Sequence, residues 1–282
     1  HRGNIGDTNS AQFANQIGSA WNTNDSNTDG NFNSLIQLWW QQKFLNDKLV
    51  ITVGKIDQTS YFNTNRYTES DDTSFMSQAL STNLVRKFPG NGLGLALLYK
   101  LNESFYVGAG LGDALGKSNA SGFNTIAEGK LFKVLELGIT PNINGKQKGN
   151  YRFTINHTDE TDDLKESSSF SFSADQDLNK SWSLFTIYSR NTTDTTSIKQ
   201  ILSGGAIYKS PFGFNEDIVG LGFSWAEVQN SDGNDQTGAE LFYRAQLSPH
   251  CQISPSVQFI LNPADTSSPS VAVFSLRVYI NL

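Results

Sequence analysis

The chain has 282 residues, a formal net charge of -6, and 37% hydrophobic against 17% charged residues. Its acidic balance, with no basic stripe to neutralise phosphates, argues against nucleic acid as a partner. The longest apolar run, around Leu93 to Tyr99, is far shorter than the roughly 20 residues that a membrane helix needs. A helical membrane protein is therefore excluded, whereas a membrane β-barrel stays open.

Short segments with alternating apolar and polar side chains follow one another from residue 34 to the end of the chain. Successive side chains of a strand point to opposite faces, so each such segment predicts a strand with one apolar and one polar face. The predicted strands span residues 34–44, 48–56, 92–101, 104–113, 130–140, 149–157, 167–176, 181–190, 198–208, 216–227, 237–247, 251–261 and 270–281.

The connections between these segments are of two kinds. Tight ones lie near residues 45–48, 101–104, 141–148, 178–181, 209–215 and 247–250; long polar ones cover 57–91, 114–129, 158–166, 191–197, 228–236 and 262–269. Outer-membrane barrels alternate short periplasmic turns with long external loops in this way. The order predicts an all-β fold, a transmembrane antiparallel up-and-down β-barrel, with residues 1–282 as a single domain.

The last strand supports the same fold. Phe274, Leu276, Val278, Ile280 and Leu282 share one face, and polar side chains share the other. Outer-membrane barrels end on such a strand, because closure of the barrel uses it.

The strand count bears on what precedes the first strand. Thirteen strands are predicted, whereas bacterial single-chain barrels have an even number. Segment 11–22 could supply a fourteenth strand; otherwise three strands lie upstream, which would give sixteen. The chain starts at His1 in mid-pattern, so we expect N-terminal strands to be missing.

Two stretches carry a resemblance to a known family. They are Gln37-Leu-Trp-Trp-Gln-Gln-Lys-Phe44 with Leu49-Val-Ile-Thr-Val-Gly-Lys-Ile-Asp57, and Glu240-Leu-Phe-Tyr-Arg-Ala-Gln-Leu-Ser-Pro249 running into Val257-Gln-Phe-Ile-Leu-Asn-Pro263. The chain resembles the carbohydrate-selective porin (OprB-type) family over most of residues 34–282. It departs from the family pattern in its terminal Leu282, where Phe is usual, and in loops that look short.

The resemblance implies a sixteen-stranded barrel in the outer membrane of a Gram-negative-type bacterium, through which sugars diffuse without a cofactor. It also implies that residues 1–33 belong to the first long loop region of the family. Sugars as solutes, outer-membrane lipid and a homo-oligomer are the partners it suggests.

Turning the apolar face of each strand towards lipid leaves a set of residues that we expect to line the pore. The set comprises Gln37, Trp39, Gln41, Lys43, Glu136, Arg152, Glu240, Arg244, Gln258, Arg277 and Tyr279. Guanidinium, carboxamide and carboxylate groups can hydrogen-bond sugar hydroxyls, and aromatic rings offer apolar faces. Glu136 is expected directly opposite Arg152 as a cross-strand ion pair.

Within this set we expect Trp39, Glu240, Arg244 and Arg277 to form a constriction. The alternative is that the charges only line a water-filled wall and satisfy one another. Loop 57–91 is the longest connection, and long loops are usually functional; folded inward, it would narrow the pore. A solvent-exposed lid, or a further strand pair near residues 80–87, is the alternative for this loop.

Signals of catalysis are weak. His1, His157 and His250 lie far apart in the sequence and lack metal-ligand spacing. No nucleophile–histidine–acid set can be proposed, so we predict a protein that is not an enzyme and needs no metal. Three hypotheses follow: a passive sugar porin, which we favour; a general or ion-biased porin; and a structural or surface-interaction barrel plugged by loop 57–91.

Overall fold

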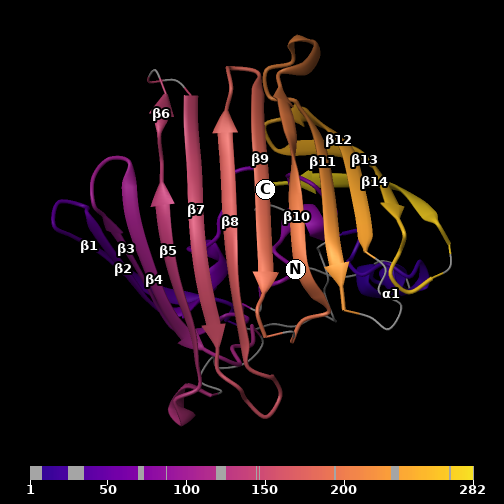
Figure 1. Ribbon diagram of the computed structural model, residues 1–282. Helices are drawn as coiled ribbons and strands as arrows, with labels where there is room; N and C mark the ends of the chain where they lie inside the picture. The colour runs from indigo at the N-terminus through magenta and orange to yellow at the C-terminus, as the bar shows by residue number, and fades with distance from the viewer. Residues whose placement is uncertain are drawn as a thin grey trace.

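The computed structural model describes residues 8–24, 35–68, 73–86, 88–118, 125–143, 145, 147–193, 195–229, 235–266 and 268–281. The expectations for His1, for Leu282 and for residues 2–7 and 25–33 concern positions outside these ranges. One antiparallel sheet contains all fourteen strands; thirteen lie side by side in the order β1-β2-β3-β4-β5-β7-β8-β9-β10-β11-β12-β13-β14, and β6 pairs with β7. Figure 1 shows the sheet curving around the N-terminal part of the chain.

Every predicted strand is present within a few residues of its predicted bounds. The strands are β1 (Leu38–Phe44), β2 (Leu49–Ile56), β3 (Gly92–Lys100), β4 (Phe105–Asp113), β5 (Leu131–Ile139), β6 (Asn142–Ile143), β7 (Gln147–Thr158), β8 (Ser167–Asp177), β9 (Trp182–Asn191), β10 (Ile198–Lys209), β11 (Ile218–Val228), β12 (Gln236–Ser248), β13 (Cys251–Leu261) and β14 (Ser270–Ile280). Apart from β5, which pairs with β7 and not with the two-residue β6, each strand pairs with its sequence neighbour, as an up-and-down barrel requires.

The short helices are α1 (Ser10–Gln16), α2 (Gln78–Ser81) and the 3₁₀ turns η1 (Gln58–Ser60), η2 (Ile126–Glu128) and η3 (Pro211–Gly213). None of the helices within the described ranges is long and apolar enough to cross a membrane.

The suggestion of a strand within residues 11–22 is wrong, because α1 occupies the first half of that segment. A capping box favours the helix: Asn9 Oδ1 accepts from the Gln12 amide at 2.8 Å, and Gln12 Oε1 accepts from the Asn9 amide at 2.9 Å. The suggested strand pair near residues 80–87 is also wrong, since α2 and turns occupy the described part of it. In the residues that the structure describes, β1 pairs only with β2 and β14 only with β13, so these two strands are the edges of the sheet.

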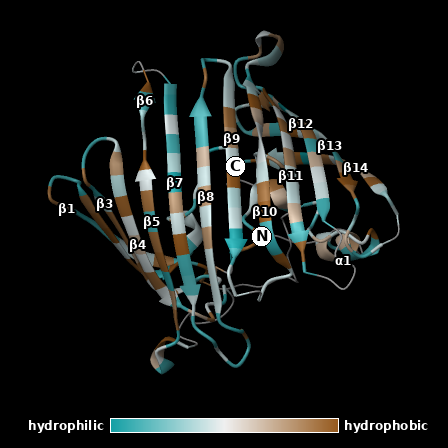
Figure 2. Ribbon diagram, viewed as in Figure 1, coloured by the Kyte–Doolittle hydropathy of each residue, from teal (hydrophilic) through white to brown (hydrophobic). Residues whose placement is uncertain are grey.

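The two faces of the sheet differ in chemistry. Figure 2 shows brown bands alternating with paler ones along strands such as β10 and β11. In β14, Phe274 and Val278 are 81% and 55% exposed and lie on the outward, apolar face. The inward face is polar at many positions: Glu136 is 1% exposed and Glu240 is 0% exposed. The alternation therefore places an apolar belt outside and polar groups inside.

Apolar side chains from loop 57–91 fill part of the interior. Phe62 packs with Phe132 and Val134, and Phe75 packs with Phe185 and other inward rings. Gly110 provides the space for Phe62, because a Cβ at this position would lie 2.5 Å from the ring. Part of the space inside the sheet is thus a packed core.

Candidate functional site

The described parts of loop 57–91, residues 57–68, 73–86 and 88–91, run through the interior of the curved sheet. Four inward-facing acidic side chains hold this loop: Glu136 in β5, Asp175 and Asp177 in β8, and Glu240 in β12. These strands lie on different sides of the interior, so the loop crosses the lumen and does not cover its mouth as a lid.

Glu240 binds backbone amides of the loop. Its carboxylate accepts from the amides of Met76 at 2.9 Å and Ser77 at 2.8 Å, and from Ser256 Oγ at 2.8 Å. Hydrogen bonds to a carboxylate in a buried place are stronger than neutral ones. Glu240 therefore fixes the segment that leads into α2.

The two arginines expected at the constriction hold the same part of the loop. Arg244 Nη1 donates to the carbonyl of Thr73 at 3.1 Å, and Arg277 Nη2 donates to the carbonyl of Ser74 at 2.8 Å. Arg277 is opposite Ser254 of β13. Together, Glu240, Arg244 and Arg277 bind one segment of the loop: Glu240 binds its backbone amides, and the two arginines bind its backbone carbonyls.

A second set of contacts between the loop and the strands is centred on Arg66. Its guanidinium contacts Asp175, pairs with Asp177 at 2.9 Å and donates to the carbonyl of Lys148 at 2.9 Å. Burial opposes the charge, but the hydrogen bonds from Arg66 to Asp177 and Asp175 outweigh it and raise the pKa of Arg66. The hydroxyl of Tyr67 donates to Asp177 at 2.9 Å, so two successive loop residues share one carboxylate.

The N-terminal segment 8–24 packs beside the loop. Gln258 Nε2 donates to the carbonyl of Thr23 at 2.8 Å, and Gln78 Oε1 accepts from the amide of Asn22 at 3.1 Å. Trp21 is buried against Ile201 and other inward residues. Gln258, expected as a pore-lining residue, therefore holds this segment in place.

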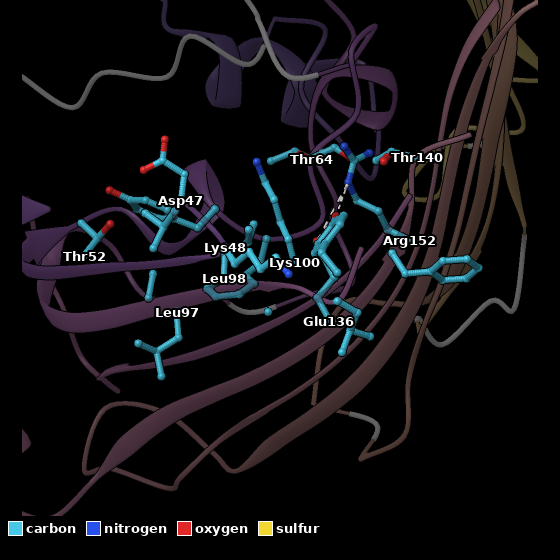
Figure 3. A pocket seen from close by; sticks show the side chains of 18 of the residues that line it. Asp47, Lys48, Thr52, Thr64, Leu97, Leu98, Lys100, Glu136, Thr140 and Arg152 are labelled. Atoms are coloured by element: carbon cyan, nitrogen blue, oxygen red, sulfur yellow. Dashed lines mark hydrogen bonds and ion pairs between the residues drawn. The ribbon is translucent and has the colours of Figure 1, made fainter. Parts of the chain in front are cut away.

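A cavity of about 1010 Å³ remains at the turn end of the interior, against β1 to β5 (Figure 3). Polar residues are more numerous than apolar ones in its lining, although apolar atoms form most of the lining surface. The polar residues include Gln41, Asp47, Lys48, Thr52, Ser60, Tyr61, Lys100, Glu103, Tyr106, Thr140, Glu136 and Arg152. Gln41, Glu136 and Arg152 belong to the set that sequence reasoning selected. Burial raises the pKa of the Tyr61 phenol, with a lowering contribution from Thr52, so this ring is a neutral donor and acceptor at physiological pH.

Glu136 and Arg152 meet at one side of this cavity, as Figure 3 shows. Arg152 Nε is 3.9 Å from Glu136 Oε1 and donates at 2.9 Å to the hydroxyl of Tyr106, which donates to the same oxygen at 2.8 Å. Arg152 Nη1 also donates to the carbonyl of Thr64 at 2.7 Å, and the Asn63 amide donates to Glu136 Oε2 at 2.6 Å. The pair thus supports the loop at the edge of the cavity.

The prediction that Glu136 lies directly opposite Arg152 is wrong by two residues. Glu136 is opposite Thr154, and Gly138 is opposite Arg152. The reason is the turn, which is centred at Gly145 and not one residue earlier; Gly145 has φ 67°, a conformation that glycine adopts readily. The ion pair is therefore diagonal.

The other predicted residues lie on or near the two edge strands. Gln41 Nε2 donates to Thr52 Oγ1 at 2.9 Å, which places Gln41 on the inward face of β1. Trp39 shares that face by alternation, and Lys43 lies 3.8 Å from Asp47 at the turn. Gln37 precedes β1, and Tyr279 pairs with Gln252 near the turn end of β14.

Sequence reasoning missed Tyr106, Thr52 and Tyr61 as cavity residues. Tyr106 and Thr52 lie on the inward face of predicted strands, so the alternation of side chains could have identified them. Tyr61 is a loop residue, and no periodicity marks its direction.

An antiparallel up-and-down sheet that is apolar outside and polar inside, with its longest loop folded into the interior, is the architecture of an outer-membrane porin. The model of the carbohydrate-selective porin, OprB family, matches residues 6–163 and 154–282, and the chain belongs to this family. The resemblance and the predicted fold class are confirmed. The protein is thus an outer-membrane carbohydrate porin of Gram-negative bacteria, and its family and fold are those of channel proteins.

Solved structures share the fold at low sequence identity. The high-pH structure of Pseudomonas putida OprB has a TM-score of 0.76 at 17% identity and covers 92% of this chain and 76% of that chain. The low-pH structure of the same protein has a TM-score of 0.59 at 18% identity, with coverage of 87% and 67%. Outer-membrane expressed OmpT of Vibrio cholerae has a TM-score of 0.51 at 10% identity, covering 86% and 81%. No match is found among the curated proteins.

Proposed function

We propose that mono- and small oligosaccharides diffuse passively along the cavity beside Glu136 and Arg152, and that loop 57–91 narrows the path. The cavity of about 1010 Å³ carries this proposal. It combines hydroxyl, amide, carboxylate and guanidinium groups, which can hydrogen-bond sugar hydroxyls, with phenol rings that can contact sugar C–H surfaces. Its volume is at the upper end of the roughly 300–1,000 Å³ usual for ligand pockets.

The narrow point lies in residues 60–64. Ser60, Phe62 and Thr64 line the cavity at the turn end and also a second cavity, of about 640 Å³, on the other side of the loop. A solute that moves from one cavity to the other must pass this segment. Because Asn63 and Thr64 are hydrogen-bonded to Glu136 and Arg152, the segment is rigid enough to select by size.

The predicted pore-lining residues take two roles in this proposal. Glu136, Arg152 and Gln41 contact solute in the cavity, with Trp39, Lys43 and Tyr279 further along the inward face of the edge strands and Gln37 just before β1. Glu240, Arg244, Arg277 and Gln258 hold the two inserted segments in place. Outer-membrane lipid covers the outward face. The proposal also includes association with further copies of this chain, which a measurement of particle size in detergent would test.

Planar-bilayer conductance with and without sugar tests the proposal. Gln41→Ala should weaken the block of current by sugar, because Gln41 lines the cavity. Gln42→Ala is the matched control: it removes the same side chain one position along β1, on the opposite face. Salt current without sugar block would favour a general or ion-biased porin, and absence of current would favour a plugged structural barrel.

A further inference from the structure

Arg86 is a buried cation with an unused hydrogen-bond donor. It follows α2 in loop 57–91 and is 5% exposed. Its Nε donates to Asn156 Oδ1 at 3.0 Å, its Nη1 donates to Ser171 Oγ at 3.4 Å, and its Cζ lies 4.2 Å from the centre of the Phe88 ring. Its Nη2 has no hydrogen-bond partner among the residues that the structure describes.

Two other arginines of this interior, Arg66 and Arg152, have acidic partners, whereas Arg244 and Arg277 donate to backbone carbonyls of the loop. Arg66 pairs with Asp175 and Asp177, and Arg152 lies 3.6 Å from Asp175. Within the described ranges, no carboxylate forms an ion pair with Arg86. Burial lowers the pKa of Arg86 to about 9, against a smaller raising effect of Glu136. A buried charge without a partner is unfavourable, so this position calls for a counterion.

The space for that counterion is the second cavity, of about 640 Å³, which Arg86 lines. Hydroxyl and amide groups dominate its polar lining, which includes Thr59, Ser60, Thr64, Thr68, Ser81, Thr82, Asn63 and Asn83. Asp57 is the acidic residue of this lining, and its carboxylate already accepts from the amide of Thr59 at 2.9 Å and from its hydroxyl at 2.6 Å. The cavity therefore presents one cation and many neutral hydrogen-bonding groups.

We propose that this cavity binds a small hydroxylated monocarboxylate, a sugar acid, whose carboxylate serves as the counterion of the Arg86 guanidinium. One guanidinium matches one negative charge, which favours a monoanion over a phosphate dianion. The hydroxyl-rich lining matches the polyol part of the ligand, and a volume of about 640 Å³ exceeds what a bare inorganic ion would fill. This goes beyond the diffusion of neutral sugars and holds whether or not the proposed path is correct.

Thermal unfolding of the detergent-purified full chain, followed by circular dichroism, tests the proposal. A ligand that binds only the folded state raises Tm with its concentration. Sodium gluconate should raise the Tm of the wild type above that in sodium chloride of equal ionic strength, and inorganic phosphate should raise it less. Arg86→Gln can keep the hydrogen bond to Asn156, because its Nε2 lies as far along the side chain as Nε of arginine, and it should weaken gluconate affinity at least tenfold. Lys117→Gln removes a cation from an outer loop, where it lies 3.5 Å from Asp163, and should leave the affinity unchanged.

Several outcomes would overturn the inference. These are the absence of a gluconate effect on the wild type, an equal effect on Arg86→Gln, and an equal effect of phosphate, which would indicate a general anion site. Should Arg86→Gln fail to fold, Thr82→Val removes a hydroxyl of the lining without touching Arg86, and it should weaken gluconate but not acetate. If sugar does not block the current of the wild type in bilayers but gluconate still raises its Tm, the proposed diffusion path is refuted and the gluconate site is not.

Discussion

Replacement of Glu240 by alanine should release the segment of loop 57–91 that precedes α2. Glu240 is fully buried, and its carboxylate accepts from the amides of Met76 and Ser77 and from Ser256 Oγ. Hydrogen bonds to charged groups contribute about 1.5–3 kcal/mol each. Two lost amide bonds therefore correspond to roughly 3–6 kcal/mol of local stability, enough to raise the open population of this segment by at least a hundredfold.

Hydrogen exchange measured by mass spectrometry gives the readout. Peptides that contain Met76 and Ser77 should exchange at least a hundred times faster in Glu240→Ala, while peptides of β7 and β8 keep the wild-type rate. Single-channel conductance should increase, because the loop no longer fills the interior as tightly. Glu227→Ala is the control: this carboxylate lies at the outer end of β11, 3.3 Å from Lys199 Nζ. Wild-type exchange and conductance in Glu240→Ala would refute the assignment of Glu240 as an anchor of the loop.

Three further changes have defined expected results. Val278→Arg should block barrel assembly in a refolding gel-shift assay, because an arginine on the outward face costs roughly 2–4 kcal/mol at the membrane midplane, whereas Ser275→Arg on the inward face should be tolerated; equal tolerance would contradict the face assignment. Arg244→Ala combined with Arg277→Ala removes two hydrogen bonds to loop carbonyls and should increase conductance and speed proteolysis of the loop. Unchanged conductance and proteolysis rates would show that these two hydrogen bonds do not hold the loop. Gly110→Val should displace the loop ring that packs on it, lowering Tm by several degrees; an unchanged Tm would contradict this packing.

The alternation of β14 illustrates what the sequence could predict. Side chains of a barrel strand face lipid or the lumen in turn, so Phe274 and Val278 identify their face without any knowledge of neighbours. The same rule placed Glu240 and Arg277 inside. The fold class and the strand bounds follow from this local pattern.

The partners of the inward groups could not be read in the same way. Glu240 binds backbone amides 163 and 164 residues away in sequence, and a backbone amide has no sequence signature. The Glu136–Arg152 pair was identified, but its register depended on the turn at Gly145. In the N-terminal segment, a capping interaction at Asn9 favoured α1 over the fourteenth strand that an even strand number suggested.

Thiol modification of residue 60 in a planar bilayer tests most directly whether solutes pass the inserted loop. The variant Ser60→Cys, with Cys251→Ser to remove the native thiol, places one reactive group where both cavities meet. A charged, membrane-impermeant thiol reagent should reduce the single-channel current, and added sugar should slow that reduction; Gln42→Cys in the same background should show neither effect. An unchanged current in fully modified Ser60→Cys protein would contradict the placement of the constriction at residues 60–64.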